Sequence, residues 1–227
     1  MAYKKWVISL GGSRIIPDEV DYEFLKDFKR FILQNSKDKF VVVTGGGMTA
    51  RKYMNALRGF GKSIDKQSEA GIDITRFHAN FLMKIFGKPA NDEIPYSVKK
   101  VKALLNKNKV VFCGALRFNH RQTTDATSAK IADFLDCSLI NLTNVKGLYT
   151  HDPKKYKNAK LVKSISWKHF YDIAKKIKFK AGQHFVLDQK AAKIIMKKKI
   201  VTYIIGSLKQ AGNVIKNKKF LGTVISG

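Results

Sequence analysis

Three consecutive glycines, Gly45 to Gly47, directly follow a run of valines at 41–43. Residues without a Cβ let the backbone turn sharply and let its N–H groups approach an anion closely. Helix-compatible residues come next, and Arg51 lies about one turn beyond the glycines. A helix N-terminus carries free N–H groups and partial positive charge, which favour a phosphate. We therefore expect a phosphate-binding loop at 45–51, although a strand-to-helix turn without a ligand would use similar residues.

A second glycine loop follows the apolar residues 5–10 near the start of the chain. Gly11 and Gly12 end this strand-like run, and Ser13 adds a hydroxyl donor. The same short sequence is equally compatible with a phosphate contact and with a plain glycine turn. Each of the two loops follows an apolar run, so the position of the loops depends on the strands that these runs form.

Apolar runs and stretches with helical spacing alternate along the whole chain. We expect strands at 5–10, 39–44, 109–114, 138–143, 200–205 and 221–225. We expect helices at 21–33, 72–86, 96–105, 126–135, 166–175, 185–196 and 208–216, with a loop from Gly59 to Gly71. This alternation predicts an α/β fold with a largely parallel sheet.

Ligands of such sheets bind at the carboxyl ends of the strands. Both glycine loops and the polar segments 115–125 and 144–153 follow predicted strands, so we expect them to line one edge and share a ligand. Thr124 or Asp125 could cap the helix at 126–135, because both residue types are favoured at N-caps. His78 is interpreted as a packed or surface histidine.

The chain carries 44 Lys and Arg against 17 Asp and Glu, a formal net charge of +27 over 227 residues. Such a charge attracts polyanions, including nucleic acid and free nucleotides. The lysines are spread along the chain, so we interpret most of them as solvated surface and expect nonspecific polyanion binding as a side effect.

No apolar run is long enough for a membrane-spanning helix, and the first residues lack the apolar core of a signal peptide. We therefore expect a cytoplasmic protein with no membrane partner. Cys113 and Cys137 both lie in apolar, strand-like sequence. Two free thiols are expected, and a disulfide between them stays open.

Several segments, in this order, resemble the amino-acid kinase superfamily and most closely its archaeal-type uridylate (UMP) kinases. They are Gly11-Gly12-Ser13, VVVTGGGMTARKY at 41–53, GIDITRFHAN at 71–80, TTDA at 123–126, LTNVKGLYTHDPKK at 142–155, AGQHFVLDQKAAKII at 181–195 and LGTVI at 221–225. The segment at 142–155 is the most specific of them. The resemblance covers essentially the whole chain, and its specificity lies in the order and spacing of the pieces.

The resemblance implies one domain, 1–227, with an αβα sandwich around a mostly parallel twisted sheet. The half at about 1–115 would bind UMP, and the half at about 116–227 would bind ATP. The implied reaction transfers the γ-phosphoryl of ATP to UMP with Mg²⁺ and without a covalent enzyme intermediate. The implied assembly is a hexamer.

The resemblance also implies roles for individual residues. The catalytic set is Gly12, Ser13 and Asp125, with Asp125 orienting cationic groups or magnesium near the γ-phosphate. The UMP-binding set is Gly46, Gly47, Arg51, Ser68, Glu69, Thr75, Thr123 and Thr124. The ATP-binding set is Gly11, Gly12, Asn144, Lys146, Tyr149 and Asp152. Lys180 precedes the segment that closes the ATP side, and no residue is assigned as a metal ligand.

This chain departs from the family pattern at several positions. Ser68, with Glu69 beside it, replaces an Asp that holds the UMP ribose. Arg121 lies in a loop that usually contains Pro-Gly, and Lys146 replaces the Asp of an NVDG motif. Ser9 replaces a first-strand Lys that archaeal-type members also lack.

These departures leave other functions open. A kinase of the same fold could use another nucleotide, or a small phosphate or carboxylate, as acceptor. Isopentenyl phosphate kinase is disfavoured because its catalytic His in a glycine-rich loop is missing from GGGMTA. A catalytically weak relative that binds nucleotide or nucleic acid through its charge is the alternative from another class.

Overall fold

The structure is a computed structural model that describes residues 3–117, 123–153, 155–176 and 186–227. In these residues one sheet of seven strands has the order β3-β2-β1-β4-β8-β9-β7. Its strands are β1 (Lys5–Leu10), β2 (Lys39–Thr44), β3 (Val110–Cys113), β4 (Ser138–Leu142), β7 (Ser164–Ile165), β8 (Thr202–Ile205) and β9 (Thr223–Ile225). Every pairing in this sheet is parallel except that of β8 with β9.

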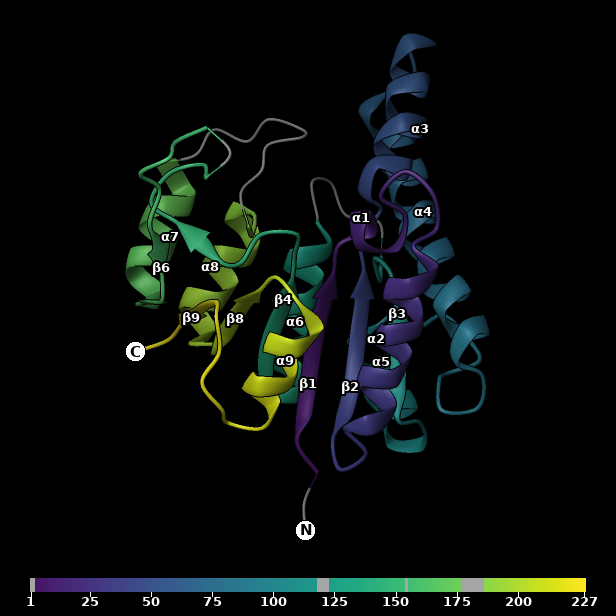
Figure 1. Cartoon of the computed structure of the whole chain (residues 1–227). Coiled ribbons are helices and arrows are strands. Elements are labelled where there is room, and N and C mark those ends of the chain that lie inside the picture. The colour runs from purple at the N-terminus through teal and green to yellow at the C-terminus, as the bar shows by residue number, and fades with distance from the viewer. Residues whose placement is uncertain (1–2, 118–122, 154, 177–185) are drawn as a thin grey trace.

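Helices cover both faces of the sheet (Figure 1). They are α1 (Gly12–Ile15), α2 (Tyr22–Gln34), α3 (Gly47–Gly59), α4 (Ile64–Phe86), α5 (Val98–Lys107), α6 (Thr124–Leu135), α7 (Trp167–Lys176), α8 (Gln189–Lys198) and α9 (Leu208–Ile215). A short antiparallel ladder of β5 (Leu148–Tyr149) and β6 (Leu161–Val162) lies apart from the main sheet. The predicted α/β sandwich with a mostly parallel sheet is confirmed.

Alternate residues of the central strands enter two separate cores, because successive side chains of a strand point to opposite faces. One core contains Val7, Val41 and Leu139, together with residues of α5, α6, α7 and α8. The other core contains the next residue of each strand, Ile8, Val42 and Ile140, together with residues of α2, α4 and α9. The valine-rich strands are therefore buried on both sides, as their composition predicts.

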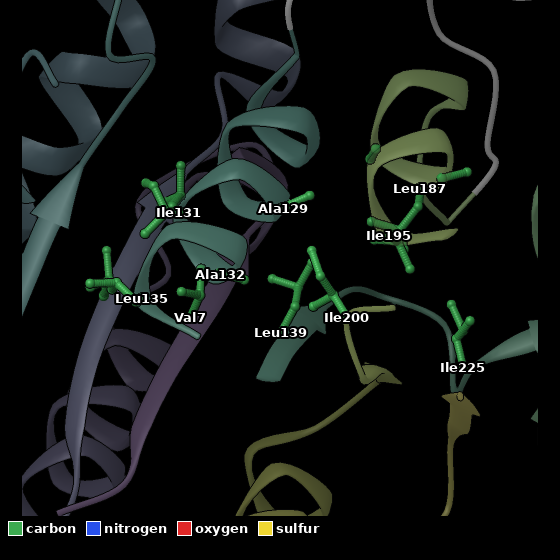
Figure 2. Close-up of a cluster of buried hydrophobic side chains, with 14 of the residues drawn as sticks. Val7, Ala129, Ile131, Ala132, Leu135, Leu139, Leu187, Ile195, Ile200 and Ile225 are labelled. Carbon is green, nitrogen blue, oxygen red and sulfur yellow. The ribbon is translucent and has the colours of Figure 1, made fainter. Parts of the chain in front are cut away.

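Figure 2 shows the first core around α6. Ala129, Ala132 and Leu135 come from this helix, and Val7 lies on the neighbouring strand β1. The small alanines let α6 pack closely on the sheet, so its first turn is held near the carboxyl end of β1. This packing is the structural support of Asp125, which lies in the first turn of α6.

The predicted loop from Gly59 to Gly71 is wrong in its second part, since α4 already begins at Ile64. The Ser63 side chain accepts a hydrogen bond from the backbone N–H of Lys66 and caps the helix. Gly71 is tolerated inside α4 because it lies against Met54 of α3, with the sulfur 3.1 Å from where a Cβ would be. The glycine marks a helix–helix contact and not a break.

Other short elements escaped the sequence prediction. They are α1, β5, β6 and β7, each of two to four residues. The N-cap of α6 is Thr123, and not Thr124 or Asp125, because the Thr123 hydroxyl accepts from the N–H of Ala126.

The two cysteines are free, and burial raises the pKa of each thiol to about 12. None of the helices in the described ranges has the length and apolar character needed to span a bilayer.

Candidate functional site

The two glycine loops are pressed against each other at the carboxyl ends of β1 and β2. A Cβ on Gly12 would lie 2.5 Å from the backbone nitrogen of Gly47 and 2.6 Å from the Gly45 carbonyl oxygen. Gly47 has a φ of +60°, and a Cβ on it would lie 2.7 Å from the carbonyl carbon of Gly12 and 2.7 Å from the backbone nitrogen of Ser13. Only glycine fits both positions, so the loops form one backbone-built unit.

Helix α4 supports this unit from beneath. The buried His78 bonds the Gly45 carbonyl oxygen through Nδ1 at 2.8 Å, so Nδ1 carries the proton and donates. The Thr44 hydroxyl donates to the carbonyl of Thr75 at 2.7 Å. The Thr75 methyl lies 3.6 Å from where a Cβ of Gly46 would be. Burial lowers the pKa of His78, which keeps it a neutral structural donor.

An open cleft of about 960 Å³ begins at these loops. One wall, the acceptor wall, consists of 13–21 of the α1 region together with Met48 and Arg51 of α3. The opposite wall, the nucleotide wall, consists of 143–153, which follows β4, with contributions from α7 and the start of the α8 region. Three strands that are adjacent in the sheet therefore deliver their loops to one cleft, as the parallel topology requires.

The cleft brings together five of the residues predicted for the site. Ser13 and Arg51 lie on the acceptor wall, and Asn144, Tyr149 and Asp152 on the nucleotide wall. The other predicted residues are placed behind or beside these walls. Gly46, Gly47 and Thr75 form the packed support just described, and Gly11 and Gly12 join β1 to Ser13.

Asp125 lies in the first turn of α6, beside the carboxyl end of β1. Its carboxylate accepts a hydrogen bond from the Ser9 hydroxyl at 2.9 Å and another from the backbone N–H of Asp188. Asp188 caps α8 by accepting from the backbone N–H groups of Lys190 and Ala191, and its second oxygen accepts from the Thr123 hydroxyl. Strand β1 and helices α6 and α8 are thus tied together through two acidic side chains.

The surroundings of Asp125 disfavour the ionised form of its carboxyl group. Burial is the main cause that raises its pKa to about 7, and the neighbouring Asp188 carboxylate adds to the effect. The hydrogen bonds from Ser9 and the Asp188 backbone act in the opposite direction. A cation brought to this place would favour the ionised carboxylate, so the site is matched to a positively charged partner.

Comparison with known proteins places this arrangement in a family. A profile described as the amino acid kinase family matches residues 4–206. The chain belongs to the amino acid kinase family. A uridylate kinase of Thermococcus onnurineus is 37% identical over 223 residues, which cover 96% of this chain and 98% of that protein. A uridylate kinase of Methanocaldococcus jannaschii is 35% identical over 228 residues, covering 97% and 99%.

A solved structure shows the same fold. The crystal structure of a uridylate kinase from Archaeoglobus fulgidus superposes with a TM-score of 0.86 at 32% identity, covering 98% of this chain and all of that one. The shared fold therefore extends over 98% of this chain.

The structure shows where the residues that depart from the family pattern lie. Ser68 lies in α4 and donates to the Ile64 carbonyl at 2.8 Å, and Glu69 pairs with Lys66 at 2.8 Å. Lys146 is exposed and does not belong to the lining of the cleft, unlike its neighbours Val145 and Gly147. Arg121 and Lys180 lie outside the described residues.

The donor atoms near Asp125 fit a magnesium ion that is carried by a nucleotide. Among the residues that the structure describes, neither Asp125 nor Asp188 forms an ion pair, and no cluster of three or more His, Cys, Asp or Glu could hold a metal alone. Mg²⁺ is usually held by one or two carboxylates together with substrate phosphates. Asp125 offers such a carboxylate, and a bound nucleotide would supply the phosphates.

Some residues that support or line the site were not assigned by the sequence analysis. Ser9 and Asp188 hold Asp125, His78 holds the glycine loop, and Arg14 lines the cleft. The only local signal for Asp188 was its place before a helix, which predicts a cap. Ser9 and His78 act across 116 and 33 residues of sequence, and such partners have no local signature.

Proposed function

We propose that this chain catalyses phosphoryl transfer from ATP to UMP, giving ADP and UDP, as part of pyrimidine nucleotide supply. The observation that carries the proposal is the near-complete coverage, in both directions, by uridylate kinases of two archaeal genera. The cleft adds chemical support, because a wall that carries two arginines, Arg14 and Arg51, faces a polar loop wall. Two nucleotides that meet by their phosphates need such opposed walls.

In the proposed reaction, an oxygen of the UMP phosphate attacks the γ-phosphorus of ATP, and the bond to the bridging oxygen of ADP breaks. Such a transfer depends on positioning and charge neutralisation more than on a strong base. We assign Arg51, with Gly46 and Gly47, to the UMP phosphate, and Ser13, with Gly11 and Gly12, to the transferring group. Asn144, Lys146, Tyr149 and Asp152 are assigned to ATP.

Asp125 is assigned to orient the cations that surround the γ-phosphate. Thr123 and Thr124 begin the helix that carries it, and the Thr123 hydroxyl holds Asp188 in place. Magnesium bound to ATP would neutralise charge on the β- and γ-phosphates, and Asp125 is the carboxylate that we assign to orient it. Ser68 and Glu69 are assigned to the ribose side of UMP, and Thr75 to the support of Gly46.

The assembly is proposed to be a hexamer in the cytoplasm. Four large apolar or aromatic side chains of the α3–α4 region are more than half exposed: Tyr53, Phe60, Ile64 and Phe77. Such a concentration is typical of a surface that another copy covers. Light scattering after size-exclusion chromatography tests this assembly, and a monomer at micromolar concentration would contradict it. Nonspecific polyanion binding is proposed as a salt-sensitive side effect of the +27 charge.

A coupled ADP-release assay tests the function. ATP with magnesium is supplied together with UMP, CMP, AMP, GMP or dUMP in separate reactions. We expect strong turnover with UMP and little with the purine nucleotides. A folded protein that binds ATP and turns over none of the five would contradict UMP as the acceptor and favour the alternatives with another acceptor or with binding alone.

A further inference from the structure

Arg14 is a second arginine on the acceptor wall, and no role has been assigned to it. It directly follows Ser13 in α1 and lines the same cleft as Arg51. The remaining charged members of this wall are Asp18, which is exposed, and Asp21, whose carboxylate accepts from the backbone N–H of Phe24 at 2.9 Å. The wall therefore presents two cations from two different elements.

The guanidinium of Arg14 is held in place on its apolar side. It lies over the ring of Phe24, 4.5 Å from the ring centroid, and Phe24 in turn stacks on the buried Phe28. Stacking on an aromatic face fixes the plane of a guanidinium and so pre-orients its donors. Arg14 is thus a positioned cation and not a freely moving surface side chain.

This guanidinium carries an unsatisfied donor. Nε is buried without a hydrogen-bond partner, and in the described part of the chain no carboxylate lies within ion-pair distance of the group. Burial lowers the pKa of Arg14 and the charge of Asp21 raises it, and an arginine stays charged under both influences. Buried donors normally have partners, and an unpaired one calls for a ligand to complete it.

We propose that Arg14 binds phosphoryl oxygens of a bound nucleotide, beside Ser13 and opposite the nucleotide wall. Arginine suits this task because its planar fork matches the oxygens of a phosphate. The inference rests on the proposed phosphoryl transfer for its substrate, and it adds a second phosphate-binding arginine to Arg51. Phosphates of ATP and UMP share the chemistry, and kinetics with each substrate varied distinguish them.

Three variants test the proposal: Arg14→Met, Arg14→Lys and, as a control, Arg30→Met. Methionine keeps an unbranched apolar stem against Phe24 and removes the charge. Arg30 is an exposed arginine of α2 that pairs with Asp27 away from the cleft. We expect Arg14→Met to lower kcat/KM roughly 10- to 100-fold, since hydrogen bonds between charged groups have about this effect. Arg14→Lys should recover part of it, and Arg30→Met should stay within about twofold.

If Arg14→Met raises the KM for only one of ATP and UMP, that result identifies the nucleotide that Arg14 contacts. Wild-type kcat/KM in Arg14→Met would overturn the proposal. Equal losses in the Lys and Met variants, accompanied by equal falls in Tm, would also overturn it, because they indicate a role in packing on Phe24.

A failure of the proposed function can be distinguished from a failure of this inference. If the wild-type protein does not phosphorylate UMP, calorimetric binding of ATP and of inorganic tripolyphosphate replaces the kinetics. About tenfold weaker binding by Arg14→Met would then still support a phosphate contact, and unchanged binding would overturn it. A wild-type protein that binds neither ATP nor UMP would overturn both proposals.

Discussion

The acceptor wall and the nucleotide wall of the cleft are built in different ways. The acceptor wall depends on backbone packing, with Gly12 and Gly47 in contact where no Cβ fits and with His78 bonding the loop from beneath. The nucleotide wall consists of exposed loop residues such as Asn144 and Asp152 around the two-residue strand β5. We infer that the first wall is shaped by backbone and is intolerant of added atoms, whereas the second recognises its ligand by side chains.

Asp125 is the residue proposed to orient cations at the γ-phosphate, and its loss is expected to have the largest effect. Asp125→Asn keeps the shape and removes the negative charge that orients cations near the γ-phosphate. We expect kcat to fall by roughly 1,000-fold or more, as for other electrostatic groups that act on the transferring phosphoryl. The assay is ADP release under saturating ATP and UMP. Turnover within tenfold of wild type would show that Asp125 lies outside the reacting centre.

The same substitution should stabilise the protein without nucleotide. The pKa of Asp125 is about 7 in the folded protein against an ordinary value of 3.8, so the folded state binds a proton that the unfolded chain releases between these pH values. The free energy of unfolding therefore falls as pH rises through this window. We expect Asp125→Asn to raise Tm by roughly 3–8 °C at pH 8 and hardly at pH 4. A lower Tm at pH 8 would contradict the unfavourable burial of the charge.

A pair of glycine substitutions sharpens the difference between the walls. Gly12→Ala places a methyl group 2.5–2.6 Å from backbone atoms of the other glycine loop. We expect a loss of roughly 1–3 kcal/mol in the free energy of unfolding and a fall in UMP turnover of roughly 100-fold. Gly59→Ala is the matched control, since its Cβ meets nothing within 4 Å at the end of α3.

Gly59→Ala should leave turnover unchanged and stabilise the protein by up to about 1 kcal/mol, because alanine is the better helix former. Denaturant unfolding and the ADP-release assay measure both effects. Equal behaviour of the two variants would refute the close packing of the glycine loops.

The sequence predicted the acceptor wall better than its surroundings. The strands 5–10 and 39–44 and the glycine loops were confirmed at their positions, because β-branched runs and consecutive glycines are strong local signals. The start of α4 was missed because glycine usually interrupts a helix, and only the three-dimensional contact of Gly71 with Met54 explains its presence.

Partners that are distant in sequence could not be predicted. Ser9 and Asp125, and Thr123 and Asp188, meet only after β1, α6 and α8 have packed together.

The central claim is that the two walls serve different substrates, and one crossed measurement tests it. The KM values for UMP and for ATP are determined in Arg51→Ala and in Tyr149→Ala. We predict that Arg51→Ala raises the KM for UMP by roughly 10- to 100-fold and leaves that for ATP within about threefold. Tyr149→Ala should do the reverse, raising the KM for ATP roughly tenfold. Equal increases for both substrates in both variants would contradict the division of the cleft into an acceptor wall and a nucleotide wall.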